Sequence, residues 1–320
     1  MDLINWIAVT LGVLLSVTTA AHALFNKHTP SSALGWVAVC LVFPFFGPVL
    51  YFIFGINRVH SRARQLENKY QAFQIDLKEY AHAVSLATLH PPDLNLSNAH
   101  LQIARVSEKV TGLPLVGGNR IDPLHNGEAV YPAMLETIAS AQKRLFLTTY
   151  IFDTNATGQQ FIDALAEAAR RGVDVRVIID GVGERYSLTR AGTKLMKQGV
   201  RVTRFLPPKL IPPEVHINLR NHRKLLIADG QVAFTGGMNI GDRHLADNID
   251  NPSRVIDLHF RVRGPITMQL ERTFIEDWAF CTGEQIEPLP CLPVKYGSAA
   301  CRVILDGPNE DINKLSTILI

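Results

Sequence analysis

The distribution of charged and apolar positions divides this chain of 320 residues near residue 57. Before that point the only formally charged side chains are Asp2 and Lys27, which leaves residues 3–26 and 28–57 without charge. Because a bilayer core about 30 Å thick is crossed by roughly 20 apolar residues in a helix, each stretch is long enough to enter a membrane. We therefore predict that residues 1–57 form a two-segment membrane anchor, a transmembrane helical hairpin.

The second apolar stretch contains Pro44, Gly47 and Pro48. Proline removes a backbone donor and clashes with the preceding helical turn, so it kinks or ends a helix. We expect residues 33–56 to form a kinked or re-entrant segment rather than a straight helix.

A cleaved signal peptide is the alternative to an anchor, since Ala21-His22-Ala23 has the small-x-small form of a cleavage site. The chain lacks a positively charged start, however, and a second apolar stretch follows at once, so the anchor is favoured.

Lysine and arginine residues near the ends of membrane segments set their orientation. Arg58, Arg62, Arg64 and Lys69 follow the second segment, whereas the loop between the segments carries only Lys27. This bias predicts that the loop lies outside the cell and that the C-terminal part lies in the cytoplasm.

Beyond the anchor the hydrophobic period changes repeatedly. Residues 58–100 combine charged positions and helical spacing with a stretch rich in proline and asparagine, which predicts a juxtamembrane helix and a linker.

Residues 101–300 alternate between helix-like and strand-like segments, which indicates an α/β domain. The predicted helices are residues 129–141, 158–171 and 188–198. The predicted strands are residues 144–152, 173–180, 200–205, 224–228 and 231–235, the last two joined by a hairpin turn at Asp229-Gly230. Residues 207–213, which include four prolines, are expected to form a stiff surface loop.

Composition narrows the possible functions. A net charge of +3 is too small for a typical nucleic-acid-binding protein, so no nucleic-acid partner is expected. Cys40, Cys281, Cys291 and Cys301 form no C-x-x-C pair and keep no zinc spacing with a histidine, so neither a disulfide framework nor a metal site is indicated. They are interpreted as thiols in a reducing compartment.

The string H-x-K-x4-D-x6-G-G-x-N, which runs from His222 to Asn239, carries the candidate chemistry. On an extended strand His222 and Lys224 project from the same face. A neutral imidazole can attack a phosphate while a neighbouring ammonium neutralises the oxyanion. The Asn239 amide can donate to the same oxygens, and Gly236 and Gly237 let the backbone approach the substrate. Because side chains supply the cations, we expect no metal and no cofactor.

At these residues the sequence resembles the phospholipase D superfamily and, more narrowly, the bacterial cardiolipin synthases. The narrower resemblance rests on the paired apolar segments, on residues 234–242 (FTGGMNIGD) and on residues 257–265 (DLHFRVRGP). It implies a phospholipase D-like α/β fold, with a mixed sheet flanked by helices. It also implies a phosphatidyltransferase of the bacterial inner membrane that makes cardiolipin from two phosphatidylglycerol molecules and releases glycerol. The reaction would pass through a phosphatidyl-histidine intermediate.

The resemblance also implies roles for single residues. His222 would form the intermediate, and Lys224 and Asn239 would hold the phosphate. Asp229 would keep the motif loop in shape. Asp257, which lies 35 positions after His222, would orient the other nitrogen of the histidine. A carboxylate there would fix the tautomer and stabilise imidazolium.

Basic residues around the motif are candidates for binding an anionic head group, although each alone is more often a solvated surface residue. They are Arg220 and Arg223, with His216, Arg243 and His244 beside them. His259 lies on the same strand face as Asp257 and serves either the site or packing. Phe146 and Tyr150 are expected in the core.

The 320 residues contain one H-x-K-x4-D motif, whereas cardiolipin synthases carry two that face each other. Residues 301–320 resemble the opening of the second half of these enzymes. We therefore expect half of an active site, completed by a missing C-terminal half or by a second copy in a homodimer. Two alternatives stay open: a single-motif phospholipase D or nuclease that acts as a homodimer, and an inactive, truncated membrane protein.

Overall fold

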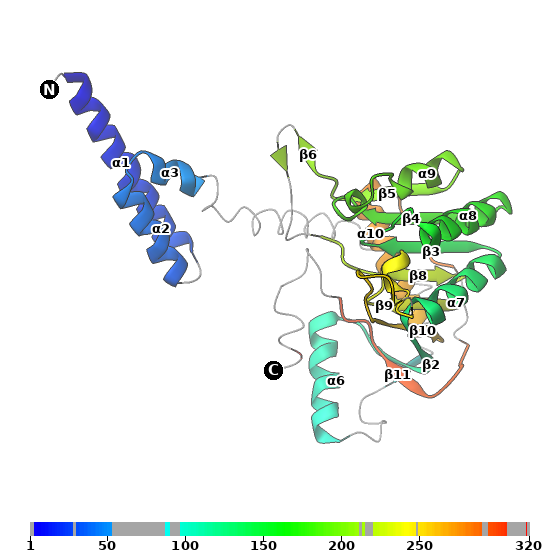
Figure 1. The fold of residues 1–320 in the computed structure, drawn as a ribbon. Helices are drawn as coiled ribbons and strands as arrows, with labels where there is room; N and C mark the ends of the chain where they lie inside the picture. The colour runs from blue at the N-terminus through cyan, green and yellow to red at the C-terminus, as the bar shows by residue number, and fades with distance from the viewer. Residues whose placement is uncertain are drawn as a thin grey trace. The chain divides into compact units, whose positions relative to one another are not determined.

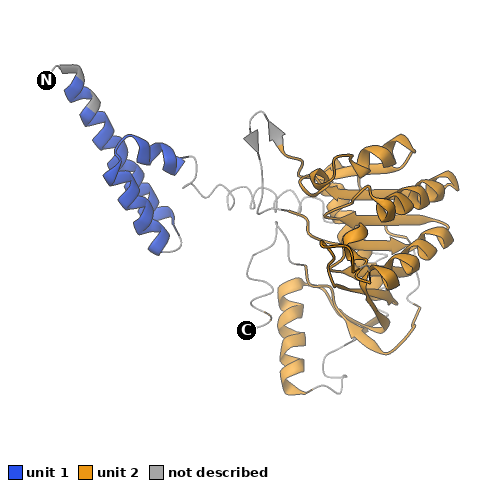
Figure 2. Cartoon of the chain, in the orientation of Figure 1, with its two compact units in different colours: residues 1–65 blue, residues 66–320 orange. Residues whose placement is uncertain are grey.

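The structure is a computed structural model that describes residues 3–27, 30–52, 87–89, 97–210, 213–214, 220–247, 249–289, 294–305 and 318. The chain divides into two compact units, residues 1–65 and residues 66–320 (Figure 2). Most of the predicted juxtamembrane helix and linker lies outside the described residues, as do Cys291 and His216. The finer division of the chain at residues 57, 100 and 300 stays a prediction.

The first unit contains the helices α1 (Leu3–Asn26), α2 (Pro30–Val42) and α3 (Phe46–Leu50). Its sequence makes α1 apolar on all sides, and Leu11 and Leu14 are more than half exposed. A helix that is hydrophobic all round requires an apolar environment. Among the described residues α1 is the helix that is long and apolar enough to cross a membrane. Helix α2 packs along α1, and the Ser16 hydroxyl donates to the carbonyl of Cys40.

The second apolar stretch is interrupted near Pro44, as predicted. Helix α2 ends at Val42, and α3 begins at Phe46 after a turn. Gly47 permits the return of the chain, because a Cβ atom there would lie 2.4 Å from the carbonyl oxygen of Val39. With 13 residues, α2 is shorter than the roughly 20 residues that span a bilayer. The described part of this stretch therefore forms two short helices and not a second full-length span.

A mixed nine-stranded sheet organises the second unit (Figure 1). The strand order is β1-β2-β10-β9-β8-β3-β4-β5, and β11 pairs with β2. Strands β3, β4 and β5 are parallel, because α8 and α9 cross over between them, and the other pairs are antiparallel. The strands are β1 (Thr88–Leu89), β2 (Leu115–His125), β3 (Arg144–Thr149), β4 (Asp174–Asp180), β5 (Arg201–Phe205), β8 (Leu225–Ala228), β9 (Val232–Gly236), β10 (Leu258–Arg263) and β11 (Ala299–Cys301).

Helices cover both faces of this sheet. Alternation along β3 sends Leu145 and Leu147 into the main core, where Phe161 of α8 packs, and sends Phe146 to the opposite face. There Phe146 stacks on Phe274 of α10 with ring centroids 4.2 Å apart. The helices are α6 (Asn98–Thr111), α7 (Asn126–Ser140), α8 (Ala156–Arg170), α9 (Ala191–Lys197) and α10 (Ile266–Thr282), with short 3₁₀ turns η3 (Gly183–Tyr186) and η4 (Asp242–His244).

The predicted α/β class, with a mixed sheet flanked by helices, is confirmed. Helix α9 begins at Ala191 and not at residue 188, because η3 and a loop occupy the preceding residues. The predicted hairpin is present, and Asp229 and Gly230 both have positive φ angles, 51° and 67°. Residues 207–213 are not only a loop, since β6 (Lys209–Leu210) pairs with β7 (Pro213–Glu214).

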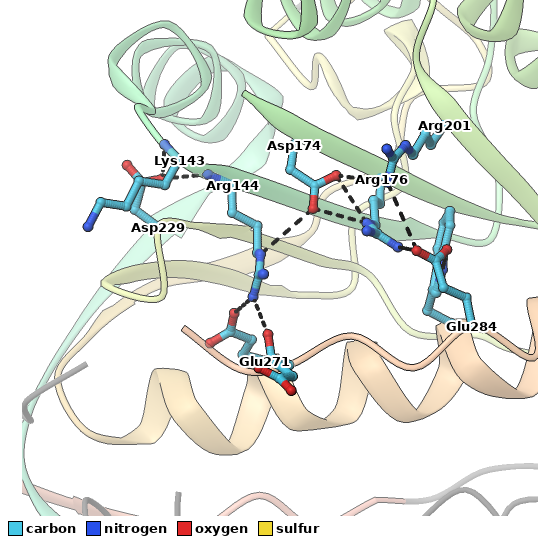
Figure 3. A network of polar contacts seen from close by, with 10 residues as sticks. Lys143, Arg144, Asp174, Arg176, Arg201, Asp229, Glu271 and Glu284 are labelled. Carbon is cyan, nitrogen blue, oxygen red and sulfur yellow. Dashed lines mark hydrogen bonds and ion pairs between the residues drawn. The ribbon is translucent and has the colours of Figure 1, made fainter. Parts of the chain in front are cut away.

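Charged residues fill the space between α10 and one end of the sheet (Figure 3). Arg144 contacts Glu271 of α10 at 3.1 Å, and Arg176 of β4 contacts Glu284 at 2.8 Å. Burial raises the pKa of Glu271, and the neighbouring Arg144 opposes this shift. These pairs help to fix α10, and the same helix carries a carboxylate, Asp277, that reaches the motif segment.

Candidate active site

The H-x-K segment lies in the extended stretch immediately before β8 and not on the strand itself. The two side chains differ in their surroundings, because His222 is exposed and Lys224 is only 5% exposed. The Lys224 ammonium turns back and donates to the carbonyl oxygen of His222 at 2.7 Å. This hydrogen bond holds the ammonium next to the backbone of His222. The strand geometry that the sequence predicted plays no part in this contact.

Tyr150 contacts both motif residues. Its ring lies 4.9 Å from the His222 ring, centroid to centroid, and 5.5 Å from the Lys224 ammonium. Tyr150 directly follows β3 and is half-buried, so the prediction that it belongs to the core is wrong, whereas Phe146 is in the core as predicted. The available signal was its position near the carboxyl end of the predicted strand 144–152, since α/β sheets place functional residues at the carboxyl ends of their strands.

The electrostatic environment favours a neutral histidine beside a cation. The pKa of His222 is lowered, first because the ring is partly withdrawn from water and second because Lys224 is close, while Asp180 opposes the shift. Burial lowers the pKa of Lys224 to about 8, although Asp257 and Asp180 favour its charged form. Near neutral pH the site therefore holds an uncharged imidazole and a desolvated ammonium, whose field is stronger than in water.

Asp180, at the end of β4, fastens the start of the motif segment. Its buried carboxylate accepts two hydrogen bonds from Nε of Arg220, at 2.9 and 3.0 Å, and one from the backbone N–H of Asn221 at 3.2 Å. It also accepts the backbone N–H groups of Val182 and Gly183 at 2.9 and 3.0 Å. Asp180 thus links the loop after β4 to the segment that carries His222, a role that the sequence pattern did not reveal.

A second carboxylate, Asp277 of α10, fastens the same segment as well. It accepts from the Asn221 side chain at 2.9 Å and from the Arg223 guanidinium at 2.9 and 3.0 Å. Arg220 and Arg223 were predicted to bind a head group, and in the structure both guanidinium groups already hold carboxylates. Their contact with a head group stays a prediction.

The Gly-Gly-x-Asn part of the motif packs against β10. A Cβ atom on Gly237 would lie 2.2 Å from Oδ1 of Asp257, and one on Gly236 would lie 2.7 Å from Nδ1 of His259. The glycines therefore make room for these two side chains in the structure. Asn239 accepts a hydrogen bond from the Ile151 N–H at 2.9 Å through Oδ1, which directs its NH₂ group away from that contact.

Two histidines accompany Asp257. Nδ1 of His244 lies 3.7 Å from Oδ2 of Asp257, and its Nε2 accepts the Asn239 backbone N–H at 3.3 Å. Nδ1 of His259 accepts the Met238 N–H at 3.4 Å. Burial lowers the pKa of both histidines, and that of His259 falls to about 4. Within the described residues no hydrogen bond or ion pair joins Asp257 to His222, so the histidine that faces Asp257 is His244.

Asp229 lies at the opposite end of β8 from His222. Its carboxylate accepts the backbone N–H groups of Gln142, Lys143 and Arg144 at 2.8 to 2.9 Å (Figure 3). Asp229 therefore ties the β8–β9 turn to the start of β3 and contacts none of the phosphate-handling candidates. The described part of the chain contains no group of three or more His, Cys, Asp or Glu side chains that could hold a metal ion.

Comparison with known proteins shows which families and relatives this chain resembles. Residues 134–278 match the family described as cardiolipin synthase, PLD-like domain, and residues 14–55 match the Phospholipase_D-nuclease N-terminal family. A cardiolipin synthase of Alkalihalophilus pseudofirmus is 32% identical over 324 residues, which cover 97% of this chain and 62% of that protein. Over nearly its whole length the chain is thus similar to cardiolipin synthases. The resemblance predicted from the motif is thus confirmed.

The chain is similar to other proteins as well. Cardiolipin synthase A of Pseudomonas aeruginosa is 29% identical over 304 residues, which cover 92% of this chain and 60% of that protein. The chain thus spans about three fifths of the length of the curated cardiolipin synthases that it matches. A solved phosphatidylserine synthase of Haemophilus influenzae is 17% identical, with a TM-score of 0.43, and covers 55% of this chain and 41% of that protein.

Proposed function

We propose that this chain forms the membrane anchor and one catalytic half of a phosphatidyltransferase that makes cardiolipin and glycerol from two phosphatidylglycerol molecules. The enzyme would work at the bacterial inner membrane with its α/β domain in the cytoplasm. The observation that carries the proposal is the uncharged, exposed His222 beside the buried ammonium of Lys224, with Tyr150 against both. Similarity to cardiolipin synthases supports the choice of a phospholipid as substrate.

The chemistry proceeds in two displacements at phosphorus. In the first, a ring nitrogen of His222 attacks the phosphodiester of phosphatidylglycerol, a nitrogen–phosphorus bond forms, and the bond from phosphorus to the glycerol oxygen breaks. The departing glycerol oxygen takes a proton from a general acid. In the second, the hydroxyl of another phosphatidylglycerol attacks phosphorus, loses its proton to the same group acting as a base, and releases His222.

Each described residue has a defined task in this scheme. Lys224 neutralises charge on the non-bridging oxygens, and its desolvation strengthens that interaction. The Asn239 NH₂ group donates to the same oxygens while its carbonyl oxygen stays on Ile151. Asp180 and Asp277 hold the segment that carries His222, which keeps the nucleophile in a reactive position. Asp257 acts on His222 only if substrate binding reorients the imidazole toward it.

The 320 residues contain one motif, so we propose that a second motif histidine acts as the general acid–base. It would come from a further part of the protein or from a second copy of the chain. General acid–base catalysis contributes about 10²–10⁴-fold, so one half alone should turn over slowly. The first half-reaction with His222 should still be detectable as a single turnover.

The test is to incubate the full chain in phosphatidylglycerol vesicles, quench with acid-free denaturant, and search for a phosphatidyl adduct on His222 by mass spectrometry. The proposal expects an adduct on His222 and none on the His222→Ala variant. Addition of glycerol should discharge the adduct to phosphatidylglycerol, and water should yield phosphatidic acid, so the products separate transfer from hydrolysis. Full cardiolipin synthesis by His222→Ala would refute the proposal.

A further inference from the structure

Residues 185–190, which comprise the end of η3 and the loop that leads to α9, expose apolar side chains. Leu188 is fully exposed, at 107% of its reference area, and Tyr186 is 67% exposed. Single exposed leucines are common on soluble proteins and need no special explanation. The exposed charged side chains next to this leucine in the sequence, however, are all positive.

The exposed face of residues 185–190 carries only cations. Arg185 and Arg190 bracket Tyr186 and Leu188, both arginines are exposed, and neither forms an ion pair with a described residue. The acid next to them, Glu184, is turned inward and is 2% exposed, where it accepts from the Arg204 guanidinium and from the Gly192 N–H. A surface with an apolar tip and arginines on both sides complements an anionic layer that covers an apolar interior.

The base of this loop is fixed to the segment that follows β3 and Tyr150. The Ser187 hydroxyl donates to Oδ1 of Asp153 at 2.8 Å, and the Thr189 and Thr154 hydroxyls are hydrogen-bonded to each other. The Tyr186 ring lies 6.3 Å from the Tyr150 ring, which in turn lies 4.9 Å from the His222 ring. The exposed tip is therefore held next to the residues that handle phosphate.

We infer that residues 185–190 dock on the surface of an anionic lipid bilayer. Leu188 enters the acyl region, Tyr186 lies at the level of the head groups, and Arg185 and Arg190 bind lipid phosphates. The docking partner is the bilayer that α1 of the same chain is long and apolar enough to cross. The inference rests on the proposed function, because this bilayer would supply the lipid that reacts with His222. Tyrosine and arginine are side chains that combine an apolar body with a polar end suited to this boundary.

The test uses the full chain reconstituted in phosphatidylglycerol–phosphatidylcholine vesicles, some of which carry bromine on their acyl chains. A Leu188→Trp variant is made in a chain with Trp6→Phe and Trp36→Phe, and an Ala139→Trp variant serves as the control. Ala139 is exposed near the end of α7, which leads to the start of β3, whereas the site lies beyond the end of β3. The remaining Trp278 is subtracted by measuring the parent chain.

Acyl-chain bromine is expected to quench the fluorescence of Trp at position 188 and not that of Trp at position 139. Replacing Arg185 with Gln should lower the ratio of docked to undocked loop about fivefold, since a basic residue at an anionic surface contributes about 1 kcal/mol. Equal quenching at both positions would overturn the inference. So would protection of position 188 from bromine together with chemical crosslinking through position 188 to a second copy, which would identify a protein contact.

Quenching is measured without turnover, so this test and the adduct test fail independently. An adduct on His222 with no quenching at position 188 would refute the docking of residues 185–190 and would still support the proposed function. Quenching with no adduct would support the docking of the domain on the membrane and would refute the proposed chemistry.

Discussion

His259 is 2% exposed, and its imidazole is neutral in the folded chain at neutral pH. Its Nδ1 accepts a hydrogen bond from the Met238 N–H, and its ring is buried beside His244 and Lys224. Burial first, and then the two neighbouring groups, lower its pKa from 6.5 to about 4. In the unfolded chain the imidazole takes a proton near pH 6.5, whereas in the folded chain it stays neutral until about pH 4. The folded state is therefore stabilised relative to the unfolded state above pH 6.5, and that stabilisation is lost as the pH falls toward 4.

The magnitude follows from the shift. A difference of about two and a half pKa units, at about 1.4 kcal/mol per unit, gives about 3 kcal/mol of stability that disappears between pH 6.5 and pH 4. The perturbation that isolates it is His259→Gln, because a glutamine oxygen can accept the same N–H but does not titrate. Other groups, including His244, titrate in both proteins, so they cancel in the difference to first order.

The assay is urea unfolding of the full chain in detergent at several pH values between 4 and 7. Trp278, buried in α10, reports on the second unit when Trp6 and Trp36 are replaced by phenylalanine. The wild-type stability minus that of His259→Gln should fall by about 3 kcal/mol from pH 7 to pH 4. A pH-independent difference between the two proteins would refute the reasoning, because it would mean that His259 has the same pKa in the folded chain as in the unfolded chain.

Other predictions concern the remaining motif residues. Because burial lowers the pKa of Lys224 to about 8, its cation is present below that pH, and the rate of adduct formation should fall as the pH rises through 8. In the Lys224→Arg variant the fall in rate should occur at a higher pH, whatever the absolute rate of that variant. A fall at the same pH as in the wild type would exclude Lys224 as its cause. Asp229→Ala removes the acceptor of three backbone N–H groups and places alanine at a φ of 51°, so it should lower the unfolding free energy by about 1–3 kcal/mol, and a loss confined to lipid affinity would contradict this structural role. Gly237→Ala should cost about 1–3 kcal/mol in the same urea assay, because the new Cβ meets Asp257, and the added substitution Asp257→Ala should recover most of that loss. Strict additivity in this double-mutant cycle would show that the two residues do not touch.

Periodic patterns were sufficient wherever a local signal decides structure. Long uncharged stretches identified the apolar helix α1, and Pro44 predicted the interruption that separates α2 from α3. The Asp229-Gly230 pair predicted the β-hairpin, because both residues tolerate the positive φ angles of that turn. The motif string was also local, since all of its members lie between His222 and Asn239, and it led to the family that the comparisons also match.

Contacts between distant segments could not be predicted in this way. Asp180 and Asp277 lie 42 residues before and 55 residues after His222, and only the packing of β4 and α10 around β8 brings them to the motif. The same packing placed Tyr150 against His222 and turned Asp257 toward His244. Sequence spacing fixes which residues share a strand face, but it does not fix which strands become neighbours.

The sequence by itself thus determined the apolar N-terminal helix, the α/β class, the hairpin and the H-x-K motif, because each depends on residues a few positions apart. Only the tertiary structure decided which carboxylates hold the H-x-K segment, which ammonium is desolvated and which histidines have a lowered pKa. Those properties depend on burial and on charges brought together by the nine-stranded sheet and the helices on its two faces. A pKa is set by the surroundings of a group in space, and the chain acquires those surroundings when it folds.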